Sequence, residues 1–397
     1  MIPRGKLDIP FSDIVAGIGY CISGYFFSKH TQRNAITGTN QLMALSVRTG
    51  LDLTLRALNF PPGTEILVSD INIPDMFNII AAHQLRAIPI PVNKYTLDID
   101  AEQVAAAVTP ATKVILIAHL FGGITALNGI AKIAKENQLV LIEDCAQAFQ
   151  GASQEESYYG HPESDVSMFS FGMIKTNTAI TGAILQFNDP ELYAKVDALH
   201  RSLPKQRISL YLKKLFKAMF ISLLSSRACY TLFYKMMMAR GKDFDHVLSS
   251  FTRGFPGNDP LKKIRYRPCE PNKRLLERRL TTFKVAHVLL RKRLFREVMT
   301  GLPADIQIGY LNQKNTNWVI PLQCQHPEEM IRHLRVNGYD ATSKASSLVR
   351  LSNSTTAAAA ENTDELSLTQ LVYLPMDISM SLSERIQLGA LIKEKFP

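Results

Sequence analysis

The chain has 397 residues, of which 46% are hydrophobic and 20% charged, a balance typical of a globular protein with a large core. Its five cysteines form no CxxC pair, which argues against a disulfide framework or a zinc site and favours a reducing, cytoplasmic compartment. The net charge of +10 is concentrated, because residues 201–300 hold 24 Lys and Arg against 6 Asp and Glu. This basic segment points to a local anionic partner.

An N-terminal segment, residues 1–40, precedes the regular pattern. Residues 9–27 read IPFSDIVAGIGYCISGYFF and are mostly apolar, but they include Asp13 and three glycines. A membrane-spanning helix needs about 20 predominantly apolar residues. The sequence therefore favours a helix that packs against the protein or lies on a surface over one that crosses a membrane.

Helices and strands alternate in the next segment, residues 41–200. We expect helices in 44–58, 76–84 and 127–137, and strands in 65–69, 88–92, 114–118, 139–143 and 168–171. Strands that read as unbroken runs of Val, Ile and Leu are buried on both faces, and their alternation with helices indicates a parallel sheet. The pattern predicts an α/β fold whose ligands bind beyond the carboxyl ends of the strands.

The rest of the chain divides into a basic, apolar helical insertion at 201–270 and a smaller α+β domain at 271–397. In the latter, NWVIPLQ predicts a strand, PEEMIRHLRVNG a helix, and SLSERIQLGALIKEKF a terminal helix. Ser381 and Glu384 have capping-box spacing at the start of that helix. The tract NSTTAAAAENTDE at 353–365 is of low complexity and predicts a loop.

Polar side chains stand at three strand ends. Asp144 follows LVLIE, Lys175 follows MFSF, and Ser46, Arg48 and Thr49 begin the helix TGLDLTLRAL. A helix N-terminus with hydroxyl groups binds anions. A lysine without an ion pair and partly desolvated has a lowered pKa and can act as a nucleophile. An anion site, a carboxylate and such a lysine are together what pyridoxal 5′-phosphate (PLP) needs.

Several motifs in the same order strengthen this interpretation: PPGTEILVSD, YTLDID, VTPATKVILIAHLFG, LIEDCAQAF and FSFGMIKTNTAITGAIL. Together they resemble the PLP-dependent sugar aminotransferases of the DegT–StrS family. The resemblance implies PLP-dependent transferase fold type I, with a large domain that has a mostly parallel central sheet and a smaller C-terminal domain. It also implies a homodimer with shared active sites.

The resemblance assigns roles to individual residues. Lys175 corresponds to the lysine that forms the Schiff base, Asp144 to the partner of the pyridine nitrogen, and Gln147 to the residue near the ring hydroxyl. Ser170 corresponds to a phosphate ligand. Asn272, in PNKRL, corresponds to an asparagine that reaches the phosphate in the neighbouring subunit. Strand packing for Ser170 and a helix N-cap for Asn272 are the alternative readings.

The sequence also departs from the family pattern. The Ser-Gly-Thr phosphate cradle is here Ser46-Val47-Arg48, followed by Thr49, so a guanidinium can supply the cation while backbone approach is tighter than at glycine. The aromatic residue that stacks on the cofactor has no clear match in DINIPDMF, where Phe77 is one candidate and Ile73 stands nearer the expected place. Phe149 replaces a histidine, and AITGA replaces a Gly-Glu-Gly-Gly run, which suggests a less polar pocket. His119 is expected to be a structural, hydrogen-bonded histidine.

The segment 209–242 has no counterpart in ordinary family members. Its apolar residues follow helical spacing beside Lys213, Lys214 and Lys217, a pattern that suits a helix in the headgroup plane of an anionic membrane. The alternative is a core or dimer-interface helix with a solvated lysine face. Nucleic acid is disfavoured, because the aromatic residues are interleaved with Met and Leu.

We therefore predict a PLP-dependent aminotransferase, cytoplasmic or peripheral at the inner face of the membrane. It would move an amino group from an amino acid, with glutamate the first choice, to a keto-sugar or related ketone. A lipid-linked or amphiphilic ketone is the second choice of acceptor. The rival hypotheses are a PLP-dependent sugar dehydratase or deoxygenase, and a membrane-recruited protein that keeps the fold without turnover.

Overall fold

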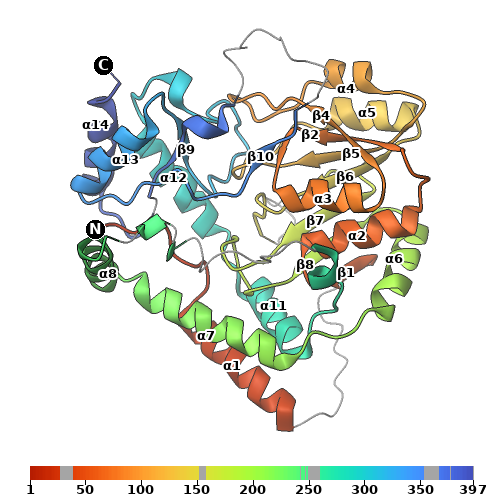
Figure 1. The fold of residues 1–397 in the computed structure, drawn as a ribbon, viewed down its shortest axis with the longest axis horizontal. Coiled ribbons are helices and arrows are strands. Elements are labelled where there is room, and N and C mark those ends of the chain that lie inside the picture. The colour runs from red at the N-terminus through yellow and green to blue at the C-terminus, as the bar shows by residue number, and fades with distance from the viewer. Residues whose placement is uncertain are drawn as a thin grey trace.

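The computed structural model describes residues 1–26, 39–151, 158–241, 243–245, 247–248, 260–352, 366–375 and 377–396. The low-complexity tract at 353–365 lies outside these residues. Within them, the fold is α/β, with a mostly parallel central sheet and a smaller C-terminal α+β part, as predicted (Figure 1). The boundaries at 40, 200 and 270 stay predictions.

The central sheet has seven strands in the order β1-β8-β7-β6-β5-β2-β4. They are β1 (Gln41–Ala44), β2 (Glu65–Ser69), β4 (Arg86–Ile90), β5 (Thr112–Ala118), β6 (Val140–Asp144), β7 (Val166–Ser170) and β8 (Ala183–Phe187). The strands from β7 to β4 run parallel to one another, whereas β8 is antiparallel to both β7 and β1. Because the runs of Val, Ile and Leu are buried on both faces, the strands need helices on each side.

Two layers of helices supply that cover. One core lies under α2 (Val47–Leu58), α3 (Pro74–Ala82) and α6 (Pro190–Ser202). The other lies under α4 (Ala101–Ala107) and α5 (Asn128–Glu136). Alternate strand residues enter opposite cores, as Ile66 and Leu67 of β2 do, because successive side chains of a strand point to opposite faces.

A third core joins the sheet to helices from distant parts of the chain. α1 (Phe11–Phe26) packs beside α7 (Ile208–Leu224) and against α11 (Glu270–Thr282), and α8 (Arg227–Ala239) continues from α7 (Figure 1). A Cβ at Gly17 would lie 2.9 Å from Leu215 and 3.1 Å from Leu275, so glycine permits this close approach. Among the described residues, no helix is long and apolar enough to cross a membrane.

The C-terminal part packs around α12 (Ala286–Met299), α13 (Pro327–Val336) and α14 (Leu382–Lys393). Its other elements are η1 (Ala304–Ile306), β9 (Pro321–Gln323), η2 (Leu368–Gln370) and β11 (Leu371–Tyr373). The strand predicted in NWVIPLQ is thus confined to its last three residues. The predicted capping box of Ser381 and Glu384 is confirmed at α14. β10 (Val349–Arg350) pairs with β3 (Ile71–Asn72) in a separate two-stranded sheet, and this pairing joins the C-terminal part to the segment that follows β2.

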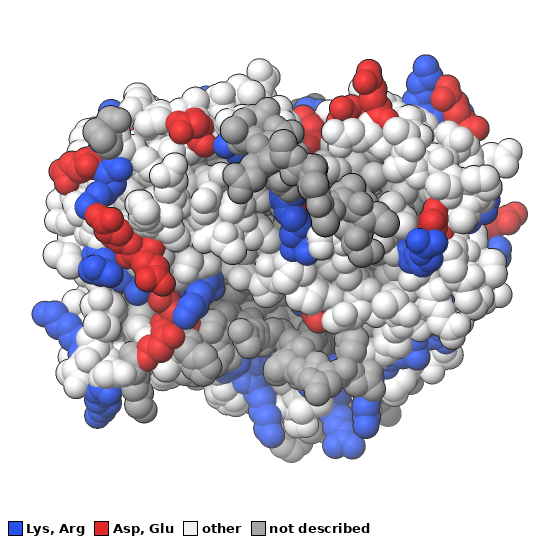
Figure 2. Space-filling view, turned by 45° about the horizontal axis from the view of Figure 1, so that its top comes forward, with Lys and Arg blue, Asp and Glu red and all other residues white. Residues whose placement is uncertain are grey.

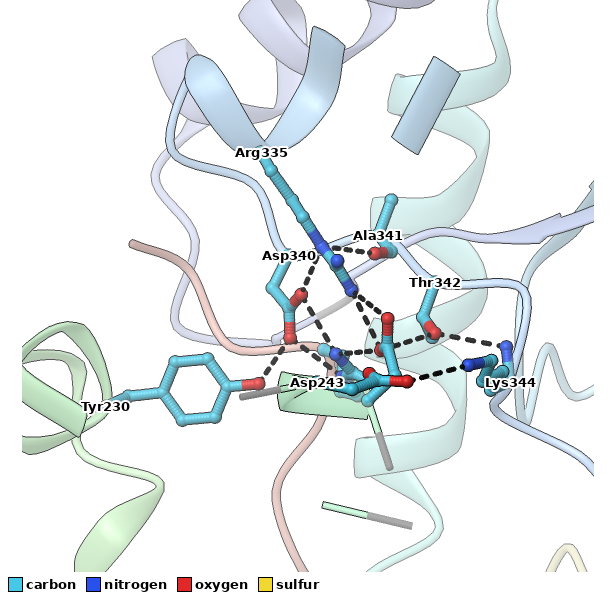
Figure 3. A network of polar contacts seen from close by, with 9 residues as sticks. Tyr230, Asp243, Arg335, Asp340, Ala341, Thr342 and Lys344 are labelled. Carbon is cyan, nitrogen blue, oxygen red and sulfur yellow. Dashed lines mark hydrogen bonds and ion pairs between the residues drawn. The ribbon is translucent and has the colours of Figure 1, made fainter. Parts of the chain in front are cut away.

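A polar network, which we call the latch, ties the N-terminus and α8 to the C-terminal part (Figure 3). Asp340 is fully buried and accepts hydrogen bonds from Arg4, Arg335 and the hydroxyl of Tyr230. Asp245 bridges the same two arginines, at 2.7 Å from Arg4 and 2.8 Å from Arg335. The two acids therefore balance the two guanidinium groups.

Candidate active site

The register of the sheet brings the predicted site residues to one edge. Asp144 ends β6 and stands opposite Met168 of β7, while Ser170 ends β7 opposite Ala183 of β8. Ala44, the last residue of β1, faces the same Ala183, so the start of α2 reaches this edge too. Lys175 follows β7 in the turn that leads to β8. Segments about 130 residues apart in sequence thus meet at the carboxyl edge of the parallel strands.

Lys175 is the group with the most unusual electrostatic position. Burial of its ammonium lowers its pKa to about 8, the carboxylate of Asp144 opposes this effect, and the positive charge of Arg48 adds to it. No salt bridge joins Lys175 to a carboxylate among the described residues. A lysine with this pKa has a substantial neutral fraction near pH 8, which is what a nucleophilic amine requires.

Trp318, which the sequence analysis did not identify, covers Lys175. The lysine Nζ lies 4.0 Å from the centroid of the indole ring, and the indole N–H donates a 3.1 Å hydrogen bond to the carbonyl of Ile174. The segment around Trp318 is fixed, because the N–H of Thr316 donates to the carbonyl of Gly122 at 2.8 Å. A Cβ at Gly122 would come within 2.7 Å of the Trp318 nitrogen, so only glycine fits there. The aromatic cover of this lysine therefore comes from residues beyond 300.

Asp144 is buried, and its pKa is raised by that burial. The interactions that act in the opposite direction and favour the carboxylate include the N–H of Ala146 at 3.0 Å, the charge of Lys175, and the amide of Asn72 at 3.5 Å. Asn72 is a second residue that the sequence analysis missed. It lies in β3, shortly after the strand EILVS, and Asp70 is the polar residue that directly follows that strand.

Glu143, on the other side of β6, belongs to a separate hydrogen-bonded cluster. His119 accepts the N–H of Thr125 at Nδ1, so its Nε2 carries the proton and donates to Glu143 at 2.9 Å. Burial alone would raise the pKa of Glu143, but donation from His119 and Tyr158 lowers it to about 2. Ligand atoms of His119, Glu143 and Cys145 lie within 4.8 Å of one another. Since the His119 nitrogens are both engaged, we interpret this cluster as structural, in agreement with the prediction for His119.

The predicted anion cradle is assembled, but its two hydroxyl groups are engaged. Ser46 caps α2 by accepting the N–H of Thr49 at 3.2 Å, and the Thr49 hydroxyl donates to the carbonyl of Ile264 at 2.8 Å. Arg48 forms a 2.5 Å ion pair with Asp75 at the start of α3. The N–H groups of the first turn of α2, which have no intrahelical carbonyl partner, and the guanidinium of Arg48 are the groups best suited to bind an anion.

The other predicted cofactor ligands differ in how deeply they are buried. Gln147 accepts the N–H of Phe121 at 2.7 Å, and Ser170 accepts the N–H of Gly172 at 3.4 Å; both side chains are half-buried at the site edge. Asn272 is fully buried within its own subunit and donates to the carbonyl of Thr181 at 2.9 Å. Its role toward a neighbouring subunit stays a prediction.

Phe149 lies in a core and not in a polar pocket. Its ring packs against Phe169, Phe171 and Phe283 at centroid distances of 5.0 to 6.3 Å. This core also includes buried residues of α1 and α7, so Phe149, at the position where the family pattern has a histidine, contributes to the core that holds these helices. Phe77, one candidate for the stacking aromatic, packs against the core under α2 and α3.

Comparisons with known proteins agree with this geometry. Residues 29–213 match the model of the DegT/DnrJ/EryC1/StrS aminotransferase family. A curated relative, 3-amino-5-hydroxybenzoate synthase of Amycolatopsis mediterranei (strain S699), is 34% identical over 168 residues. That match spans 42% of this chain and 41% of the relative.

Solved structures are similar over nearly the whole chain. DesI, crystallised in the presence of its TDP-sugar product, has a TM-score of 0.65 at 15% identity and is covered over 92% of its chain by 99% of this one. NtdA of Bacillus subtilis, with bound cofactor PMP, has a TM-score of 0.63 at 17% identity, with 87% of its chain and 99% of this one covered. At these identities the likeness establishes the fold.

Proposed function

We propose, from the match of residues 29–213 to the model of the DegT/DnrJ/EryC1/StrS aminotransferase family, that this protein transfers an amino group from an amino acid to a keto-sugar. The observation that carries the proposal is Lys175, an amine whose pKa is lowered to about 8, beside the buried carboxylate of Asp144. Proteins of this family use PLP. Transamination needs an amine that can both hold this cofactor and move protons, and Lys175 is suited to both tasks.

The residues present fit PLP in three respects. Lys175 would hold its aldehyde carbon, Asp144 its protonated ring nitrogen, and the start of α2 with Arg48 its phosphate. The donors around Asp144 suit this role, because the N–H of Ala146 and the amide of Asn72 orient its carboxylate and favour the ionised form against the effect of burial. When bound, this cofactor accepts the electron pair released at the amino acid Cα.

The side chains of this chain would then manage the protons. Lys175, as a neutral amine, would remove the proton from the Cα of the amino donor, and as an ammonium it would return a proton to the product side. Its lowered pKa makes both forms accessible near neutral pH, which general acid–base catalysis requires. Trp318 would keep the amine from turning away toward solvent, since the ring lies 4.0 Å from Nζ.

The proposed donor is glutamate and the proposed acceptor a keto-sugar carried by a nucleotide. The acceptor choice is supported by DesI, a structural relative crystallised with a TDP-sugar product. The curated relative named as a 3-amino-5-hydroxybenzoate synthase indicates that a related, non-sugar ketone is the alternative. A lipid-linked or amphiphilic ketone is a further alternative, favoured by the exposed apolar helices α1 and α7.

The test is direct. The purified, PLP-supplemented protein is incubated with glutamate and a panel of nucleotide-linked keto-sugars, cyclic non-sugar ketones and amphiphilic ketones, and the products are identified by mass. Amine product formed in equal amount to 2-oxoglutarate supports transamination. Loss of a hydroxyl group without consumption of glutamate would instead establish a dehydratase, and no turnover by a protein that holds PLP on Lys175 would favour a binding protein.

We further propose a homodimer in which Asn272 contributes to the neighbouring site, as the family resemblance predicts. Two inactive variants, Lys175→Ala and Asn272→Ala, are mixed after partial unfolding and refolded together. If the sites are shared, mixed dimers regain part of the activity, because one of their two sites has both residues intact. Absence of recovery, with dimers confirmed by light scattering, would contradict a shared site.

A further inference from the structure

We propose that the outer faces of α1, α7 and α8 dock the protein on the surface of an anionic lipid bilayer. We call this surface the apolar ledge. Its principal apolar residues are Val15, Ile22, Phe216, Phe220, Leu223 and Leu232, all of them exposed. The proposal concerns where the protein works, and it does not depend on which ketone is aminated.

The ledge exists because α7 is apolar on both sides. Tyr211, Leu215 and Ala218 face inward and are fully buried, which fixes the rotation of the helix. The opposite side consequently leaves Phe216 and Phe220 outside, with 47% and 51% of their surface exposed. Clustered exposed aromatic and aliphatic side chains at helical spacing indicate an interaction surface, because water-facing helices are normally polar there.

The neighbouring helix repeats this arrangement. On α1, Val15 and Ile22 are exposed by half, while Ile14 and Cys21 beside them are fully buried. α1 and α7 lie side by side below the sheet in Figure 1 and pack against each other. The only acidic residue of α1, Asp13, is buried and accepts from two arginines of α11.

The charge of the ledge identifies its partner. Residues 208–241 contain no Asp or Glu. Lys213 and Lys217 lie next to Phe216 and Phe220 on α7, and Lys235 is exposed on α8. Figure 2 shows basic side chains, with no acidic ones among the described residues, along the lower edge of the molecule. The surface is therefore complementary to a negative partner.

A bilayer fits these observations better than a second copy of the chain. Lysine is depleted from the centres of protein–protein interfaces, and two copies of this face would bring like charges together. At a bilayer, the apolar residues enter the acyl boundary while the lysine stems extend toward the headgroups. Each basic residue near an anionic surface strengthens binding about fivefold.

The helix that carries the ledge contacts the loop that follows Lys175. The hydroxyl of Tyr211, on the inner face of α7, donates a 3.0 Å hydrogen bond to the carbonyl of Ala179, in the loop between Lys175 and β8. At the other end, Arg227 at the start of α8 is paired with Glu384 at 2.6 Å. Docking through the ledge would therefore hold the site at a fixed orientation to the membrane surface.

The experiment measures partition of the full-length, PLP-loaded protein onto sonicated vesicles by flotation. The vesicles are made of phosphatidylcholine alone, or of phosphatidylcholine in which about one lipid in three is replaced by phosphatidylglycerol. Two variants remove one element each: Phe216→Ser with Phe220→Ser, and Lys213→Glu with Lys217→Glu. The controls, Val336→Ser with Ile386→Ser and Lys113→Glu with Lys195→Glu, change exposed apolar and basic residues elsewhere.

We expect binding to the anionic vesicles alone, weakened by salt, with a loss of about thirtyfold or more in the lysine variant and unchanged binding in both controls. Retained PLP absorbance and circular dichroism show that each variant is folded. The proposal is overturned if the protein does not float with anionic vesicles, or if the controls lose binding as much as the ledge variants. It is also overturned if the phenylalanine variant converts dimers to monomers without any vesicle binding in the wild type, since the ledge would then join two copies.

Discussion

The latch and the active site both contain buried charges, but they differ in how those charges are compensated. In the latch, Asp340 receives two arginines and a tyrosine hydroxyl, and Asp245 bridges the same arginines (Figure 3). At the site, Lys175 is influenced by one attracting carboxylate, one repelling guanidinium and an aromatic ring. The charges of the latch therefore compensate one another, whereas the site has an amine close to losing its proton at physiological pH.

This difference distinguishes charged side chains that stabilise the fold from a charged side chain that is available for reaction. A saturated cluster raises the cost of removing any member, since each partner left behind is a buried charge. An incompletely paired group has energy to gain from a covalent or ionic partner, which is how active sites are commonly built. The five predictions below test this contrast, beginning with the largest effect.

Replacing Lys175 with Ala should abolish both cofactor attachment and turnover. Loss of an amine that serves as attachment point and proton carrier is expected to lower the rate at least about 10⁴-fold. Borohydride reduction of the PLP-loaded protein followed by peptide mass analysis measures attachment. Lys94→Ala, which removes another buried lysine, is the matched control and should keep the label on Lys175. Label on a different lysine in the wild type would refute the assignment.

Replacing Asp144 with Asn should lower turnover about 10²- to 10³-fold while leaving Lys175 able to carry the label. The amide is isosteric but cannot hold a proton on the cofactor ring by charge. Because Asp144 raises the pKa of Lys175, its loss should also lower that pKa below about 8. Steady-state kinetics and the pH profile of labelling measure the two effects. Unchanged turnover would exclude the proposed role.

Replacing Asp340 with Asn should destabilise the fold by about 3 kcal/mol, because two arginines lose a fully buried partner. Urea unfolding monitored by circular dichroism measures the change. Asp243→Asn is the control, since its pair with Lys344 is more than half exposed and should contribute less than about 1 kcal/mol. Equal effects of the two substitutions would show that the latch does not act as a buried network.

Replacing Arg48 with Gln should raise the pKa of Lys175, because the guanidinium charge lowers it in the wild type. The amine would then be more fully protonated near pH 7.5, and its reaction with an aldehyde would be slower there but recover at higher pH. Pyridoxal, which lacks the phosphate, is the appropriate probe, since Arg48 is also proposed to bind that group. Arg56→Gln, in the last turn of α2, is the control. A midpoint that moves to lower pH would contradict the electrostatic account.

The sequence predicted the parts of this arrangement that local patterns encode. EILVS is β2 to the residue, and the helix after Ser46 and the capping box of α14 lie where spacing placed them. Lys175 and Asp144 were recognisable because polar groups that end buried strands of a parallel sheet share an edge. These features depend on period and strand polarity, which are properties of short segments.

The remaining features depend on contacts between distant segments, which carry no local signal. The Thr49 hydroxyl donates to the carbonyl of Ile264, which is 215 residues away in sequence. Gly122 packs against the Trp318 backbone over a similarly long sequence separation. The family pattern placed the stacking aromatic near residue 73, where the chain has Ile73. The sequence showed that an aromatic was missing there but not that Trp318 covers Lys175 from the C-terminal part.

The ring of Trp318 over Lys175 leads to the prediction with the smallest expected effect. A ring over an ammonium favours its charged form by about 1 kcal/mol, so Trp318→Leu should lower the pKa of Lys175 and change its labelling rate less than about tenfold. Trp318→Phe keeps a ring, so the pKa of Lys175 in this variant should lie between those of the wild type and Trp318→Leu. Since Trp318 is the only tryptophan of the chain, its fluorescence in the wild type should also fall when PLP binds beside it. If the leucine and phenylalanine variants both labelled at the wild-type rate and midpoint, and wild-type fluorescence did not respond to PLP, the ring would be a packing residue of the C-terminal part without influence on the charge of Lys175.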